Sequence, residues 1–83
     1  MRDSAIMTVR IFSRQQAIDV DVPLDITAND FVIALNEAFH LGIDTEIILN
    51  CFLKTENPTA LIRGNRLLRD YGLQNGTVIN ITE

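Results

Sequence analysis

TANDFVIALNEAFHLG, residues 27–42, has the only sustained apolar stripe of helical period in the chain. Thr27 is a suitable N-cap, with Asp30 in the first turn, and Gly42 can adopt the left-handed conformation that ends a helix. At about 100° per residue, the apolar side chains fall on one face. That face consists of Ala28, Phe31, Val32, Leu35, Ala38 and Phe39. The stretch is therefore predicted to be an amphipathic helix with one buried face.

Short segments rich in β-branched residues lie on both sides of this helix and predict strands. They are residues 7–11, 18–22, 47–53, 60–63 and 78–81. Polar residues 13–16 are predicted to join the first two strands in a hairpin, and residues 54–59 to form a turn. Because a lone helix cannot bury its own stripe, a sheet must cover it. The predicted fold is α+β, with a mixed sheet of four to five strands covering one helix. We expect one domain over residues 6–83, after a disordered N-terminus of residues 1–5.

Composition excludes several classes of function. The chain of 83 residues has a net charge of −4 and a single lysine, which argues against nucleic acid and against an anionic membrane surface. No apolar run approaches the roughly 18 residues of a membrane span, and no signal peptide is visible, so we expect no membrane insertion and a cytoplasmic location. A lone cysteine, Cys51, excludes an internal disulfide and is compatible with a reducing compartment.

The chain offers little from which to build an active site. Catalysis needs a nucleophile with a base, a paired acid and base, or a metal site. His40 is the only histidine, Cys51 is expected to face the core, and no glycine loop is suited to phosphate. We therefore expect no enzyme activity, no cofactor and no metal site.

The order of the elements and residues 65–73, NRLLRDYGL, resemble the ubiquitin β-grasp fold. More narrowly, the ending DYGLQNGTVINI, residues 70–81, is similar to that of the small YukD/EsaB ubiquitin-like proteins encoded with bacterial type VII, or WXG-type, secretion systems. This resemblance implies a protein-interaction module that supports or regulates such a system by noncovalent docking, with proteins of the secretion machinery as partners.

Covalent chemistry of the ubiquitin kind requires a flexible tail that ends in Gly-Gly. The sequence ends at Ile81-Thr82-Glu83, and no glycine follows Gly76. We therefore expect neither a protein modifier nor a sulfur carrier. Two alternatives stay open: a truncated protein of that kind, or the ubiquitin-like domain of a larger membrane component of the secretion system.

Alternation along the predicted strands places a second apolar group on the side of the sheet away from the helix. Its members are Phe12, Ile48, Phe52 and Val78. Such a cluster is typical of a surface for partner binding or for association into a homo-oligomer. Alternatively, some members pack under loops, or the third strand is shifted by one residue. Ile33, on the polar face of the helix, is a separate candidate contact. Where ubiquitin has the apolar patch read by its receptors, the matching positions are Asn50, Asn80 and Thr82, so we expect those receptors not to bind.

Overall fold

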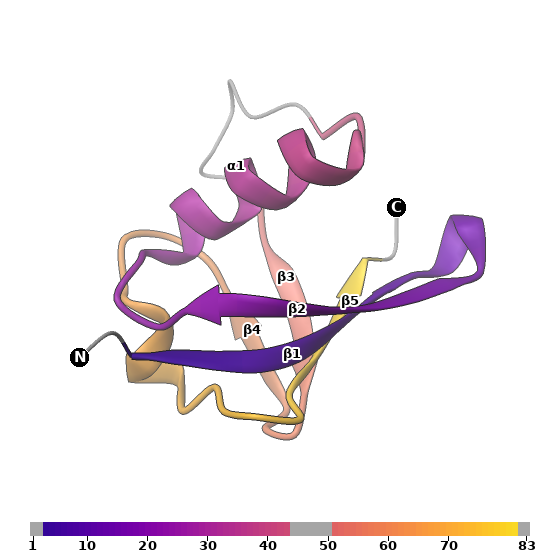
Figure 1. The fold of residues 1–83 in the computed structure, drawn as a ribbon. Coiled ribbons are helices and arrows are strands. Elements are labelled where there is room, and N and C mark those ends of the chain that lie inside the picture. Colours follow the sequence, from indigo (N-terminus) through magenta and orange to yellow (C-terminus); the bar gives the residue numbers. More distant parts are fainter. Residues whose placement is uncertain (1–2, 44–50, 82–83) are drawn as a thin grey trace.

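A five-stranded mixed sheet packs against one α-helix in the computed structural model, which describes residues 3–43 and 51–81 (Figure 1). The elements, in chain order, are β1 (Ser4–Ile11), a 3-10 helix η1 (Phe12–Arg14), β2 (Gln16–Pro23), α1 (Ala28–Phe39), β3 (Leu53–Glu56), β4 (Ala60–Ile62), a 3-10 helix η3 (Leu68–Tyr71) and β5 (Val78–Ile81). The predicted α+β class and mixed sheet are confirmed.

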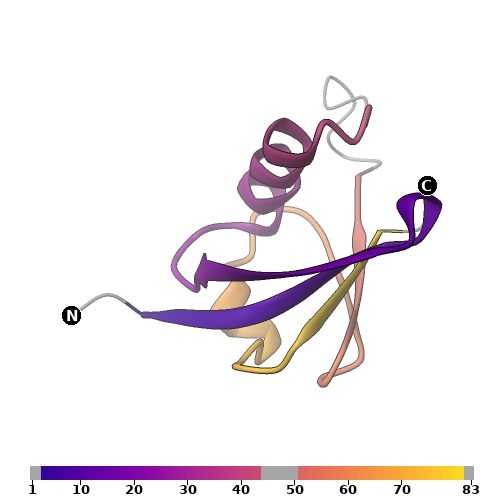
Figure 2. The same cartoon turned by 45° about the vertical axis from the view of Figure 1, so that its right-hand side comes forward.

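The sheet has the strand order β2-β1-β5-β3-β4. Its two central strands, β1 and β5, are parallel, and every other pair is antiparallel. The helix lies on one side of the sheet in both views (Figure 1 and Figure 2). Between them lies the core, to which the sheet contributes the fully buried Met7, Val9, Ile62 and Ile79. We call the other side of the sheet the open face, because no α-helix in the described part of the chain covers it.

The helix begins as predicted but ends earlier. Thr27 is the N-cap, and its hydroxyl oxygen accepts a hydrogen bond from the Asp30 amide at 3.1 Å. The prediction that Gly42 ends the helix is wrong, because His40 already adopts the left-handed conformation and its amide donates to the Asn36 carbonyl. Ala38, which was assigned to the apolar stripe, lies within the helix but is exposed.

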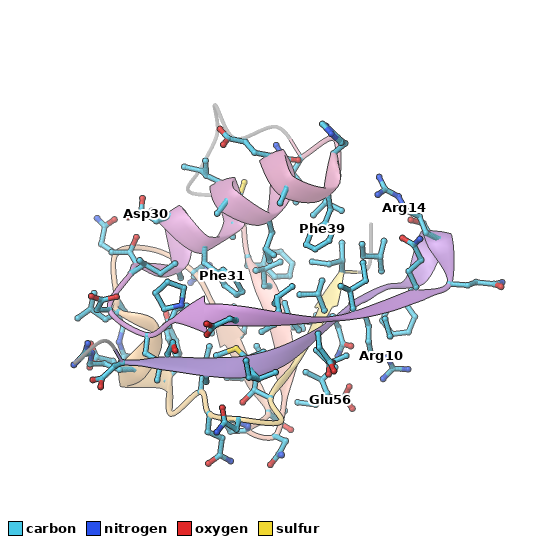
Figure 3. The ribbon with its side chains drawn as sticks, in the orientation of Figure 1. Arg10, Arg14, Asp30, Phe31, Phe39 and Glu56 are labelled. Atoms are coloured by element: carbon cyan, nitrogen blue, oxygen red, sulfur yellow. The ribbon has the colours of Figure 1, made fainter. Side chains whose placement is uncertain are left out.

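The early end of the helix coincides with a contact from the β1–β2 hairpin. Arg14, in η1, donates from one guanidinium nitrogen to the Phe39 carbonyl at 2.6 Å and from the other to the His40 carbonyl at 2.7 Å. Figure 3 shows its side chain rising from the hairpin tip toward the end of the helix. The last carbonyls of a helix lack partners and form the negative end of its dipole, so a guanidinium satisfies both needs.

The domain starts earlier than predicted. β1 begins at Ser4, and Ala5 is buried opposite Val22, so the expected disorder over residues 1–5 is wrong for these two positions. The carbonyl of Asp3 also accepts a hydrogen bond from the Leu24 amide at 3.0 Å. Ladder pairing with β2 therefore orders this segment despite its lack of an apolar pattern. Residues 1–2 lie outside the described part of the chain.

The third strand was predicted too early. β3 covers Leu53–Glu56, which lies mostly within the predicted turn of residues 54–59. Residues 44–50 lie outside the described part of the chain, and Cys51 and Phe52 precede the strand. The strand was missed because Lys54 and Glu56 belong to the open face, where charged side chains are tolerated. β4 and β5 lie where they were expected.

We predict that Arg14→Ala lowers the free energy of unfolding by about 1 kcal/mol, because two carbonyls at the helix end lose a charged donor. Arg14→Lys should recover part of the loss, since it keeps the charge but not the two-pronged geometry. Urea denaturation measures both. Arg63→Ala is the matched control, because its exposed guanidinium makes no hydrogen bond or ion pair within residues 3–43 and 51–81. Equal stability of the Arg14→Ala and Arg63→Ala proteins would contradict the assignment.

Candidate protein-interaction surface

The register of the sheet determines which side chains share the open face. In the antiparallel pair of β3 and β5, Lys54 lies opposite Asn80 and Glu56 opposite Val78. In the parallel pair, Asn80 is the partner of Arg10. Because side chains alternate along a strand, these residues project away from the helix together.

A polar network crosses the middle of the open face. Glu56 lies 3.4 Å from the guanidinium of Arg10, and the same carboxylate oxygen accepts a hydrogen bond from the Asn80 amide at 3.0 Å. Figure 3 shows Arg10 and Glu56 beside each other on the side away from the helix. The Arg10 guanidinium also lies over the Phe12 ring, 5.0 Å from its centroid. The network thus links three strands and orients one of the exposed aromatic rings.

Two of the predicted contact residues come to the same end of the sheet. Phe12 follows Ile11, whose partner on β5 is Ile81, and Phe52 immediately precedes β3 at the end paired with β5's last residues. Both rings are 48% exposed. β5 lies between the segments that carry Phe12 and Phe52, so the two backbones are two strand spacings apart, about 10 Å. We call Phe12 and Phe52 the aromatic pair.

The remaining predicted residues do not join the aromatic pair. Val78 is half-buried and lies next to Thr8 and Glu56, on the far side of the polar network. Ile33 is half-buried on α1, which covers the opposite side of the sheet. Ile48 lies outside the described residues. The predicted four-residue cluster is therefore reduced, among the residues that the structure places, to the aromatic pair.

The sequence interpretation missed two exposed apolar residues, Ile6 and Leu61, which are 51% and 46% exposed. Alternation could have revealed both, because Ile6 stands between the buried Ala5 and Met7, and Leu61 between the half-buried Ala60 and the buried Ile62. A surface hollow of about 280 Å³ was also not foreseen. It adjoins Phe12 and is lined by Arg10, Ile11, Phe12, Gln15, Gln16 and Ala17. A partner could place a side chain there, beside the aromatic ring and the guanidinium.

The comparison with the receptor patch of ubiquitin also changes. The β3 residue opposite Asn80 is Lys54 rather than Asn50, because the strand lies later in the chain than predicted. Asn50 and Thr82 lie outside the described residues. Lys54 is exposed and charged, so the centre of the open face is still polar, with Lys54 in the place predicted for Asn50. That ubiquitin receptors do not bind stays a prediction.

Cys51, Tyr71 and Arg66 have structural roles. Cys51 is buried, as expected for a small core side chain. The Tyr71 hydroxyl donates to the Arg63 carbonyl at 2.8 Å and accepts from the Arg63 amide at 3.3 Å. The Arg66 guanidinium lies over the Tyr71 ring. Within residues 3–43 and 51–81, His, Cys, Asp and Glu side chains form no group of three or more that could hold a metal ion.

No helix in the described ranges is both long enough and apolar enough to cross a membrane.

Residues 6–81 match the protein family described as the WXG100 protein secretion system (Wss) protein YukD. The match spans the whole sheet and helix apart from the first two residues of β1. No curated protein matches the sequence.

Solved structures share the fold at low sequence identity. The C-terminal ubiquitin-like domain of mouse tubulin-specific chaperone e is 14% identical, with a TM-score of 0.71 over 95% of this chain and 84% of that one. The ubiquitin-like domain of Plasmodium falciparum Dsk2 is 16% identical, with a TM-score of 0.61 over 96% and 100%. The ubiquitin-like domain of the Mycobacterium tuberculosis type VII secretion protein ECCD1 is 15% identical, with a TM-score of 0.56 over 98% and 99%. These likenesses confirm the predicted ubiquitin-like β-grasp fold.

We predict that Phe12→Ser and Phe52→Ser each change the free energy of unfolding by less than about 1 kcal/mol, because both rings are half exposed. Ile79→Ala, at a fully buried position, should cost about 3 kcal/mol. Chemical denaturation of the three variants provides the measurement. A loss at Phe12 or Phe52 as large as that at Ile79 would show that the ring is part of the core and not of a contact surface.

Proposed function

Since the chain belongs to the YukD family of the WXG100 protein secretion system, we propose that it is an accessory or regulator of a bacterial type VII secretion apparatus. It acts in the cytoplasm by docking noncovalently onto proteins of that machinery. The family match over residues 6–81 is the observation that supports this role most directly. In this proposal the protein binds and does not catalyse.

The aromatic pair supports the open face as the docking surface. Aromatic residues and arginine are enriched at the centres of protein interfaces, where a few anchors supply most of the binding energy. Phe12 and Phe52 provide two half-exposed rings at one end of the sheet, and Arg10 stands over the first of them. The adjoining hollow can receive one partner side chain, while the Arg10–Glu56–Asn80 network fixes the surface between the strands.

A second candidate role follows from the likeness to the ubiquitin-like domain of ECCD1. In that case the chain would be the ubiquitin-like part of a larger secretion component. The intact mass of the protein purified from its native cells separates the two roles. A mass equal to the 83-residue chain favours the small accessory protein, and a larger mass whose sequence continues into apolar spans favours the second candidate.

The test is capture of the tagged protein from its native cells, once under native and once under denaturing conditions. We expect type VII secretion proteins, identified by mass spectrometry, only in the native capture. The Phe12→Asp, Phe52→Asp double variant should lose at least nine-tenths of them, because two anchors are removed, each typically worth a tenfold change or more. Ile6→Asp, Leu61→Asp is the matched control, since it makes the same chemical change at similarly exposed positions of the same open face, and it separates the aromatic pair from the rest of that face.

Several outcomes would contradict parts of this proposal. Adducts that survive denaturation would favour the alternative that the protein is a covalent modifier. If the two double variants lose captured secretion proteins equally, the aromatic pair is not the specific contact. Recovery of only further copies of the chain would favour a homo-oligomer, and unchanged secretion of WXG-type substrates after deletion of the gene would argue against any role in secretion.

A further inference from the structure

β2 is an edge strand, and its hydrogen bonds show which backbone groups are left at the edge. On β1, the amide of Ile6 donates to Asn75 Oδ1 at 2.8 Å, and the amide of Thr8 donates to the Thr77 carbonyl at 3.0 Å. Both amides therefore point toward β5 and away from β2. The β2 residues opposite them are Asp21 and Asp19. In such a non-hydrogen-bonded antiparallel pair, the N–H and C=O groups of both residues point outward.

By the same alternation, the backbone of Ala17 also points outward, since it is the partner of Arg10. No other described strand pairs with this side of β2, and no hydrogen bond from another described element reaches the amides of Ala17, Asp19 or Asp21. The edge thus presents a row of unpaired donors and acceptors along an eight-residue strand.

We propose that this edge binds an extended segment of a partner protein, which adds to the sheet as a sixth strand, and that this segment alternates basic and apolar residues. The main-chain bonds would supply affinity, and the side chains of β2 would select the sequence.

The selection follows from the two faces of β2. On the open face, the charged residues of the strand are Asp19 and Asp21, both exposed, so an added strand would place Lys or Arg opposite them. On the helix side, Ile18 and Val20 are half-buried, and Val20 packs against the core. Apolar residues at the intervening positions of the partner would complete their burial. The basic and apolar requirements alternate because side chains alternate along a strand.

Charge argues against a second copy of this chain as the occupant. Antiparallel pairing of two β2 strands would bring the aspartates of one copy beside those of the other, and like charges on neighbouring strands are destabilising. The opposite edge of the sheet is a weaker candidate, because β4 has only three residues. This inference does not depend on a secretion role. Its surface includes neither Phe12 nor Phe52, and it adjoins the aromatic pair only at Ala17, which also lines the hollow beside Phe12.

The test uses a synthetic eight-residue peptide, blocked at both ends, with Lys alternating with Val and Ile. Amide hydrogen exchange is followed by NMR with and without saturating peptide. The amides of Ala17, Asp19 and Asp21 should exchange at least tenfold more slowly in the complex, because they gain partners. The amides of Ile18 and Val20, which already bond to β1, are internal controls and should change little. The Phe52→Asp protein, changed beside β3 and far from β2 in the sheet, should bind the peptide as well as the original protein.

Three controls make the result decisive. The Asp19→Asn, Asp21→Asn protein should bind about tenfold more weakly, as two exposed ion pairs are lost. A peptide with Glu in place of Lys should not bind. A peptide N-methylated on the alternate residues that face β2 should also fail, since its donors are blocked while its charge is kept. No binding at millimolar peptide, equal binding of the Lys and Glu peptides, or binding without slower exchange at the three outward amides would overturn the proposal. Concentration-dependent slowing of the same amides without peptide would assign the edge to self-association instead.

Discussion

Burial of one apolar helix face against one side of one sheet is the constraint on which the structure depends. α1 contributes Phe31, Val32 and Leu35 to the core, and the sheet contributes the inward-facing residues of its strands. The helix covers a single side, so the other side of the sheet and both of its edges remain for contact with other molecules. The division of the sheet into a packing side and a side open to contact therefore follows from the presence of a single α-helix within residues 3–43 and 51–81.

Sequence reasoning predicted the elements whose pattern is local. The N-cap at Thr27, the strand Val78–Ile81 and the brief strand after Pro58 follow from capping chemistry and alternation. It failed where the bounds of an element depend on contacts with residues distant in the sequence. The helix ends at Phe39, where Arg14 from another element binds the carbonyls of Phe39 and His40. Likewise, β3 was predicted too early because its open-face residues are charged and do not look like strand residues. Only their pairing with β5 shows that they belong to a strand.

The candidate site shows the same limit more strongly. Alternation correctly placed Phe12 and Phe52 on the exposed surface, but it could not show that a polar network separates them from Val78. That network joins residues of three strands that are far apart in the sequence, so no local pattern contains it. The outward backbone of β2 is also invisible in the sequence, because it depends on which β1 amides turn toward β5. Surfaces of this kind are properties of the sheet rather than of any one strand.

The parallel pair at the centre of the sheet has a consequence for how the chain folds. Two hairpin-like pairs, β1 with β2 and β3 with β4, join neighbours in sequence and can form early. They are connected only through β5, which pairs Val78 with Thr8 across most of the chain. Closure of so long a loop precedes the contacts that stabilise it, and this raises the entropic barrier to folding. During synthesis on the ribosome, the two halves of the sheet must therefore wait for β5, and cooperative folding of this domain can begin only once β5 has been made.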